Sequence, residues 1–324
     1  MSTVFLTGAS GFLGGHILTE LVKAGHTVKA MSRRAESDAA ISALGGLPVR
    51  AGLDNVDQLK AVLADCSAVF HVAADTSMWK PHAAAQTATN VQGTKNLIAA
   101  AESVRVQAFI HTSSVSAFSH LVQDTLVESL PQRGGESWIN YERTKYLSEQ
   151  LVRKSALPWI VFNPANIIGP GDHHGWARLI KLVDQNKLPG IPPGMGNFAD
   201  VREIAKAQVQ AWRENKIGEC YLVGGESIRF LDFVHHVGTA LGRKTPNHPL
   251  PVWAIMTYAR LIDAWSRVTG KEPDITPESA TLTSYGHHVD SSKAQHELQY
   301  QITPIDTLIA DTLAWMRAEG MIGH

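Results

Sequence analysis

The sequence predicts an α/β fold, in which helices cover both faces of a doubly wound parallel sheet and a smaller, discontinuous, mostly helical lobe packs on it. Short apolar runs alternate with segments of helical period through the first half of the chain. A glycine-rich turn joins the first apolar run to the first helical segment, and loops rich in proline and glycine interrupt the second half. The length of 324 residues suits one large α/β domain with such a lobe.

The expected strands are short apolar runs, most of them followed by a helical pattern. The first runs from Val4 to Thr7 and stops at Gly8, and apolar residues then recur at helical spacing from Phe12 until Gly25, which ends the helix. Strands that alternate with helices predict a parallel sheet, because right-handed crossovers leave few other arrangements. The remaining strands are expected at residues 27–31, 48–51, 68–73, 108–112, 159–163 and 220–223.

The organisation changes after the sixth of these strands. Proline and glycine open a loop at residues 164–171 and recur at residues 189–194, which predicts that the chain leaves the sheet here. We expect a first domain at residues 1–165, with the sheet resuming at about 198–224, and an interleaved substrate lobe at residues 166–324. Helices of this lobe are expected at residues 176–186, 230–241, 252–268 and 305–319.

Charge and composition argue against several classes of protein. The 29 Lys and Arg residues nearly balance the 30 Asp and Glu residues, so a nucleic-acid partner is not expected. Cys66 and Cys220 support neither a disulfide framework nor a thiolate metal site, and the adjacent histidine pairs have no acidic or cysteine partner. With no signal-like N-terminus and no apolar run of about 20 residues, we expect a cytoplasmic protein without a metal and without a nucleic-acid or membrane partner.

The glycine-rich turn has the pattern of a dinucleotide-binding loop. Gly8-Ala-Ser-Gly11-Phe-Leu-Gly14 lies directly between the first strand and the first helix. Glycine lets the chain turn tightly and brings backbone N–H groups against a pyrophosphate, and the helix N-terminus adds partial positive charge. A purely structural turn is the alternative, which the matching strand and helix disfavour. The expected cofactor contacts in this turn are Gly8, Ser10, Gly11, Phe12, Leu13 and Gly14.

Two arginines follow the second strand, in Met31-Ser-Arg33-Arg34. In dinucleotide-binding folds an acidic residue here binds the ribose hydroxyls, whereas a basic residue accepts a 2′-phosphate. No carboxylate occupies this window, and guanidinium groups can grip phosphate oxygens in a bidentate fork. We therefore expect NADP(H) as the preferred cofactor. NAD(H) is the alternative if Arg33 and Arg34 are only solvated loop charges.

A tyrosine and a lysine in Tyr141-Glu-Arg-Thr-Lys145 share one face of a predicted helix. An ammonium group close to a phenol lowers the pKa of the phenol, so that tyrosine can exchange a proton with a substrate oxygen near neutral pH. Such a pair also arises by chance in many helices. The pair therefore predicts a catalytic site only together with the motifs that accompany it.

Further motifs follow other predicted strands or lie in helices. They are His71-Val-Ala-Ala74, Asn90-Val-Gln-Gly-Thr-Lys-Asn-Leu97 and Thr112-Ser-Ser114. With the glycine turn and the Tyr/Lys pair, they make nearly the whole chain resemble the extended short-chain dehydrogenase/reductase family, to which NAD-dependent epimerases and dehydratases belong. The segment Asp200-Val-Arg-Glu-Ile-Ala205 is most similar to the dihydroflavonol and cinnamoyl-CoA reductase branch. The resemblance implies a Rossmann fold whose first domain binds NAD(P).

The resemblance also implies roles for individual residues. Tyr141 is the implied proton donor in carbonyl reduction, Lys145 holds the nicotinamide ribose, and Ser114 hydrogen-bonds the substrate oxygen. Asn90 either braces the backbone of the active site or is a structural amide.

The remaining cofactor contacts follow the third, fourth, fifth and sixth predicted strands. The family often has an aspartate after the third strand that contacts adenine, and Gly52 stands in its place here. The adenine contact is therefore open, with Asp54 as the nearby substitute. The contacts implied are Leu53, Ala73, Ala74, Thr112, Ser113 and Pro164.

Taken together, the motifs imply an NADP-dependent oxidoreductase that reduces a small carbonyl compound, as a monomer or homodimer. Apolar residues near the predicted site suggest an apolar or aromatic aldehyde or ketone, although each is also a candidate for the core. These residues are Met78, Trp79, Phe118, Trp138 and Trp176.

Two other functions remain open. The first is a nucleotide-sugar epimerase or dehydratase, disfavoured because no acidic residue follows the second strand and because Val115-Ser116 stands where dehydratases carry Asp-Glu. The second is a non-catalytic NADP sensor, and sensors of this kind usually lack the Tyr/Lys pair.

Overall fold

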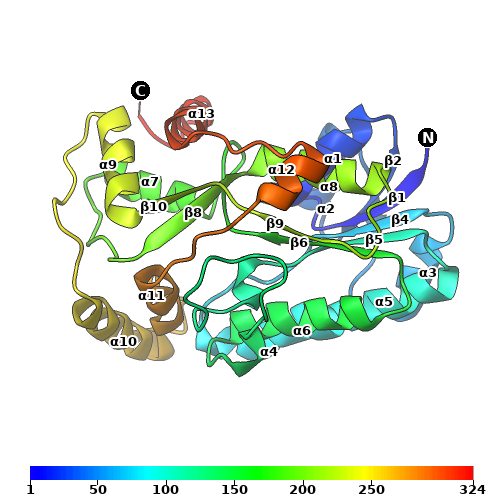
Figure 1. Cartoon of the computed structure of the whole chain (residues 1–324), viewed down its shortest axis with the longest axis horizontal. Coiled ribbons are helices and arrows are strands. Elements are labelled where there is room, and N and C mark those ends of the chain that lie inside the picture. The colour runs from blue at the N-terminus through cyan, green and yellow to red at the C-terminus, as the bar shows by residue number, and fades with distance from the viewer. Residues whose placement is uncertain (324) are drawn as a thin grey trace.

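A parallel sheet forms the centre of the molecule, and the computed structural model describes residues 1–323 (Figure 1). Its strands are β1 (Thr3–Thr7), β2 (Thr27–Ser32), β3 (Leu47–Arg50), β4 (Ala68–His71), β5 (Ala108–Thr112), β6 (Trp159–Pro164) and β9 (Cys220–Val223). They lie in the order β3-β2-β1-β4-β5-β6-β9, and all neighbours are parallel. The order reverses between β1 and β4, and ligands of open α/β sheets bind at such a reversal. The predicted fold class is confirmed.

The strand bounds differ most from the prediction at β4, which ends at His71 instead of at residue 73. The backbone N–H groups of Val72 and Ala73 donate to Thr7 Oγ1, both at 3.1 Å, instead of to a neighbouring strand. The side chain of Thr7 therefore ends β4 beside the glycine turn.

Helices cover both faces of the sheet. Those of this domain are α1 (Phe12–Lys23), α2 (Ala35–Ala43), α3 (Val56–Leu63), α4 (Ala83–Thr87), α5 (Gly93–Val104), α6 (Asn140–Lys154) and α8 (Val201–Arg213). Helices α1 and α8 pack on one face, and α3, α5 and α6 on the other (Figure 1). Val4 and Leu6 of β1 point into the first core and Phe5 into the second, because successive strand side chains face opposite sides. Burial on both sides makes the strands continuously apolar.

The lobe has a small sheet of its own, in the order β10-β8-β7. Its elements are β7 (Asn166–Ile168), β8 (Met195–Asp200), β10 (Glu226–Arg229), α7 (Trp176–Asp184), α9 (Phe230–Leu241), α10 (Val252–Thr269), α11 (Pro277–Ser284), α12 (Ser292–Leu298) and α13 (Ile305–Ala318). Ile180 of α7, Phe198 of β8, Phe233 of α9 and Ile309 of α13 share one core. The rings of Phe198 and Phe233 stack with centroids 4.1 Å apart.

The prediction that the main sheet resumes at about 198–224 needs correction, because only β9 of that range rejoins it. Strand β8 pairs with β7 in parallel and with β10 in antiparallel orientation. Strand β7 begins just beyond the end of β6, and β8 pairs with β7 instead of with a strand of the main sheet. Strands β7 and β10 were not predicted, because β7 has only three residues and β10, Glu-Ser-Ile-Arg, has a single apolar residue.

Helix α10 lies at one end of the molecule, beside α11 (Figure 1). It is attached to the segment after β4, since Trp79 Nε1 donates to Ser266 Oγ at 3.0 Å. Across residues 1–323, none of the helices combines the length and the apolar character needed to cross a bilayer.

Candidate active site

A cleft of about 1790 Å³ lies at the carboxyl ends of β1, β4, β5 and β6. One wall comes from the segments that follow these strands, and the other includes Trp176 and Leu282 of the lobe. It gathers nearly all the catalytic and cofactor residues predicted from sequence. These are Gly8, Ser10, Gly11, Phe12, Leu13, Gly14, Arg33, Leu53, Ala73, Ala74, Thr112, Ser113, Ser114, Tyr141, Lys145 and Pro164.

The glycine turn fits a pyrophosphate. Gly8 has a φ of +77°, and a Cβ on Gly14 would lie 2.0 Å from the carbonyl oxygen of Gly8. Helix α1 begins after Gly11 with no side-chain cap and no acidic residue in its first turn. Its free N–H groups and its partial positive charge are therefore available to an anion in the cleft.

The arginines after β2 have different positions. Arg33 is exposed on the cleft, whereas Arg34 lies outside it and precedes the first residue of α2. Arg34 is not among the residues that line the cleft, so its contact with the cofactor stays a prediction. Sequence reasoning missed Arg50 at the end of β3, which donates to Ser32 Oγ at 3.0 Å and forms an ion pair with Asp38. Of Arg33, Arg34 and Arg50, Arg33 is the residue that lines the cleft.

The segment after β3 reaches the part of the cleft where the sequence predicts the adenine contact. Leu53 and Asp54 both line it, and Asn96 Nδ2 holds the carbonyl oxygen of Leu53 at 2.8 Å. A Cβ on residue 52 would lie 2.3 Å from Asp54 Oδ1, so Gly52 is what allows that carboxylate to fold back. The carboxylate that sequence analysis considered as a substitute therefore lies at the cleft.

Tyr141 and Lys145 lie one turn apart at the start of α6. Burial raises the pKa of Tyr141 to about 12, although a hydrogen bond with Ser114 acts in the opposite direction. Burial lowers the pKa of Lys145 to about 8, against the effect of Glu149. Lys145 Nζ donates to the carbonyl oxygen of Thr112 at 3.0 Å. The expectation that Lys145 lowers the pKa of Tyr141 is not met in the chain by itself, because desolvation dominates both groups.

Ser114 is held by polar contacts on both sides. Its Oγ accepts from the backbone N–H of Ser116 at 3.1 Å, at the start of a short 3-10 helix, η3 (Val115–Ala117). Its carbonyl oxygen accepts from Asn163 Nδ2 at 3.1 Å. Asn163 also donates to the buried Glu149 at 2.7 Å. Asn163 therefore connects Ser114 to α6.

Asn90 connects the segment after β4 to α6. Its Oδ1 accepts from the N–H of Asp75 at 2.7 Å, and its Nδ2 donates to the carbonyl oxygen of Asp75 at 2.9 Å and to Thr144 Oγ1 at 3.1 Å. Asn90 belongs to a π-helical turn, Ala88–Gln92, just before α5. Asn90 therefore fixes the backbone of Asp75 and contacts the side chain next to Lys145, and the two roles implied from the sequence both stay predictions.

His71 forms a buried connection beneath the cleft that sequence reasoning missed. One ring nitrogen is 2.8 Å from Thr7 Oγ1 and the other is 2.9 Å from Thr94 Oγ1. Burial, with the charge of Lys145, lowers the pKa of His71 to about 3. A neutral imidazole therefore joins β1, β4 and α5 at the base of the site.

A family model places this arrangement among known proteins. Residues 4–224 match the model of the NAD dependent epimerase/dehydratase family. The chain belongs to this family. It is an NAD(P)-dependent enzyme of the extended short-chain dehydrogenase/reductase type, acting on CH–OH or C=O groups.

Several members of the epimerase/dehydratase family resemble this chain over their full length. A Synechocystis protein provisionally named as a dihydroflavonol 4-reductase is 27% identical, covering 98% of this chain and 95% of its own. A Stigmatella aurantiaca 4-hydroxy-2-methyl-3-oxo-4-farnesyl-3,4-dihydroquinoline-1-oxide ketoreductase is 29% identical, covering 99% and 98%. The crystal structure of gox2253 is 29% identical with a TM-score of 0.84, covering 100% of both chains. The Bacillus cereus UDP-glucuronic acid 4-epimerase with UDP-glucuronic acid and NAD has the same fold, at 21% identity and a TM-score of 0.78, covering 98% and 99%.

Five residues of this chain were predicted to contact the substrate. Two of them, Met78 and Trp176, line the cleft. The other three do not. Trp79 is buried against α10, and Phe118 lies in a small core with Val122, Leu126 and Leu222. Trp138 is 50% exposed outside the cleft, because its neighbours Ser137 and Ile139 point inward.

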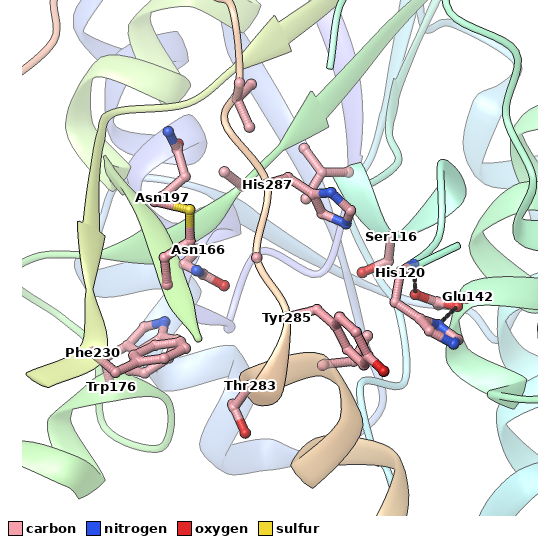
Figure 2. A pocket seen from close by; sticks show the side chains of 16 residues that line it. Ser116, His120, Glu142, Asn166, Trp176, Asn197, Phe230, Thr283, Tyr285 and His287 are labelled. Carbon is pink, nitrogen blue, oxygen red and sulfur yellow. Dashed lines mark hydrogen bonds and ion pairs between the residues drawn. The ribbon is translucent and has the colours of Figure 1, made fainter. Parts of the chain in front are cut away.

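A second cavity, here called the side pocket, adjoins the cleft and shares Ser116, Asn166 and Trp176 with it. It has a volume of about 110 Å³ (Figure 2). One wall is aromatic, with Trp176 stacked on Phe230 at 5.6 Å between centroids. The opposite wall is polar and contains His120, Glu142 and His287, none of which sequence reasoning identified.

Proposed function

We propose that this chain is an NADP-dependent reductase of small aldehydes or ketones, or a dehydrogenase of the corresponding alcohols. The observation that carries the proposal is that Ser114, Tyr141 and Lys145 line one cleft together with the glycine turn. These groups provide a hydrogen bond, a proton and a positive charge at one place, which is what carbonyl reduction needs.

Each of these groups has a distinct task. Bound nicotinamide supplies the hydride. Ser114 and Tyr141 hydrogen-bond the carbonyl oxygen as its negative charge grows, and Tyr141 gives that oxygen a proton. With a pKa of about 12, the hydroxyl of Tyr141 is protonated at neutral pH and can act as this donor. The ammonium of Lys145 supplies the nearby positive charge that stabilises the phenolate left behind.

The charge around the substrate favours a neutral compound over a nucleotide-sugar. Among the described residues that line the cleft and the side pocket, Arg33 and Lys145 are the only lysine or arginine, and both lie on the cofactor side. Proteins bind a substrate diphosphate with guanidinium or ammonium groups or with helix N-termini. The reductase and ketoreductase names of the relatives support the same conclusion.

The preference for NADP rests on Arg33. Its exposed side chain lines the cleft just after β2, where a 2′-phosphate is recognised in dinucleotide-binding folds.

Incubation with NADPH and a panel of aldehydes and ketones, followed by absorbance, tests the proposal. Oxidation of NADPH that depends on the carbonyl compound supports the reductase. Tightly retained NAD with turnover of nucleotide-sugars would instead indicate an epimerase. Binding of NADPH without turnover of any compound would indicate a sensor.

A further inference from the structure

The polar wall of the side pocket is built around a buried carboxylate. Glu142 is fully buried and His120 is 8% exposed. The Glu142 carboxylate accepts hydrogen bonds from Ser119 Oγ at 2.6 Å and from the backbone N–H of His120 at 2.7 Å, and it lies 2.9 Å from His120 Nδ1. Burial works against ionisation, but hydrogen bonds from His120, Ser119 and Ser137 outweigh it and hold the pKa of Glu142 below its ordinary value. Glu142 is therefore a carboxylate at neutral pH.

This carboxylate fixes the ring of His120. When Nδ1 of His120 carries the ring proton and donates a hydrogen bond to Glu142, the other ring nitrogen, Nε2, is left as an acceptor for a group in the pocket. Figure 2 shows the ring of His120 beside Glu142, with Ser116 and Tyr285 around the same space. The buried carboxylate therefore holds the ring of His120 in one orientation at the pocket wall.

His287 adds a second imidazole to the same wall. Its Nδ1 is buried and has no hydrogen-bond partner within residues 1–323. Burial, the largest influence, lowers the pKa of His287; Glu142 raises it and His120 lowers it further, and the net result is a neutral ring at the pocket. A buried ring nitrogen without a partner costs stability unless a ligand or water satisfies it.

These groups select for a neutral ligand. No lysine or arginine is found among the described residues of the pocket wall, and its charged carboxylate is that of Glu142. A substrate carboxylate or phosphate would lie beside that carboxylate with no cation to balance it. A hydroxyl group, which both donates and accepts, can pair with an imidazole nitrogen without bringing charge.

The side pocket is placed to hold a second group of the substrate that reacts at Tyr141. Glu142 directly follows Tyr141, and Ser116 of the pocket donates through its backbone N–H to Ser114 Oγ. Ser116 and Asn166 line both cavities. A compound whose carbonyl lies at Ser114 and Tyr141 can therefore extend a substituent toward His120.

We propose that the side pocket binds a hydroxyl group of the substrate through His120 and His287, so that the substrate is a neutral hydroxyketone or hydroxyaldehyde. This proposal rests on the proposed reductase function and names its substrate class. Glu142 is a positioning residue that acts through His120.

The test uses three matched series of methyl ketones with NADPH. One series carries a hydroxyl group one, two or three carbons from the carbonyl, the second has a methyl group in its place, and the third has a carboxylate. For the best spacing, we expect kcat/KM of the hydroxyketone to exceed that of the methyl analogue by about tenfold or more, because loss of the hydroxyl leaves buried polar groups unpaired. We expect the keto acid to be the poorest substrate. Equal rates for hydroxyl and methyl compounds at every spacing, or a preferred keto acid, would overturn the proposal and leave the reductase function standing.

Variants locate the effect. In His120→Asn, we expect the ratio of kcat/KM between the hydroxyketone and its methyl analogue to fall toward one. We expect Glu142→Gln to lower the same ratio, because the carboxylate no longer orients the ring of His120. Exposed His288 does not line the pocket, so His288→Asn serves as the matched control and keeps the wild-type ratio. An unchanged ratio in both His120→Asn and Glu142→Gln would contradict the assignment.

Binding separates failure of this proposal from failure of the proposed function. If no ketone is reduced, calorimetry with the NADPH-bound enzyme still compares the affinity of each hydroxyketone with that of its methyl analogue. Tighter binding of the hydroxyketone in the wild type, lost in His120→Asn, supports the pocket even when the reductase function fails. Equal affinities reject the pocket.

Discussion

The cofactor half of the cleft is lined mostly by segments that directly follow strands of the main sheet, whereas the side pocket is lined by residues near the start of α6, by the segment after β5 and by the small sheet, helices and loops of the lobe. In the cofactor half, backbone geometry is decisive: Gly8 needs its positive φ and Gly14 tolerates no Cβ. In the side pocket, side chains such as His120 and Trp176 form the walls. The shape of the cofactor half therefore depends on the path of the backbone, and that of the side pocket depends on which side chains are present.

The cofactor half of the cleft and the side pocket also differ in charge. The cofactor half has Arg33 and Lys145 and the free N-terminus of α1, all suited to a phosphorylated ligand. The side pocket contains the buried carboxylate of Glu142. This difference suggests that cofactor binding and substrate selection can be changed separately by mutation.

Tyr141 lies between the cofactor half of the cleft and the side pocket, and Tyr141→Phe has the largest expected effect. Removal of the phenolic oxygen takes away the proton donor, so we expect turnover to fall by about 10²- to 10⁴-fold while NADPH affinity stays within a few-fold. Steady-state kinetics and a fluorescence titration with NADPH measure the two quantities. Tyr146→Phe, on the same helix but outside the cleft, is the control. Near-normal turnover in Tyr141→Phe would show that the site has been assigned wrongly.

Gly14→Ala tests the dependence of the cofactor half on the path of the backbone. The new Cβ would lie 2.0 Å from the carbonyl oxygen of Gly8, so the turn has to move and NADPH binding should be lost or fall by more than about tenfold. At the next residue, a Cβ on Gly15 meets Leu44 Cδ1 at 3.6 Å, an ordinary contact. Gly15 also lines the cleft, but its Cβ makes only ordinary contacts, so Gly15→Ala should weaken NADPH binding far less than Gly14→Ala, measured by titration. It should also stabilise α1 by about 0.5–1 kcal/mol, measured by denaturant unfolding. Similar losses in both variants would refute the distinction.

The contrast between the halves explains what the sequence could and could not predict. Gly8, Gly11 and Gly14 form one local pattern, and Tyr141 and Lys145 lie one helical turn apart, so each motif is visible within a few residues. Their meeting in one cleft follows from the alternation of strands and helices, because parallel strands place their carboxyl ends at one edge.

The side pocket has no such local signature. His120, Glu142 and His287 lie far apart in the sequence, and the pairings of β8 with β7 and β10 bring Asn197 and Phe230 to the same pocket. Trp138 was proposed as a substrate residue because it is close to Tyr141 in sequence. Closeness in sequence does not reveal which way a side chain points when its neighbours are buried.

A pH titration of stability tests the support beneath the cofactor half. The pKa of His71 is about 3 in the fold, against an ordinary value of 6.5, so the folded state favours the neutral ring. Its contribution to stability is complete above pH 6.5 and is lost as the pH falls toward 3, because the unfolded chain takes up a proton that the fold resists. Between pH 7 and pH 5 the expected loss is about 2 kcal/mol from this residue. Denaturant unfolding of wild type and His71→Gln measures it. An equal slope in both proteins would remove His71 as the cause.

Arg33→Ser has the smallest expected effect and tests whether the charge of the cofactor half selects the cofactor. A charge-assisted contact to a 2′-phosphate is lost, so Kd for NADPH should rise by about tenfold, while Kd for NADH changes little because NADH lacks that phosphate. Arg34→Ser is the matched control, since Arg34 follows the same strand but lies outside the cleft. Titration of both variants with both cofactors gives four affinities. Equal weakening of NADPH in the two variants would mean that general surface charge attracts the cofactor, and equal weakening of NADPH and NADH in Arg33→Ser would place Arg33 on a part that both cofactors share.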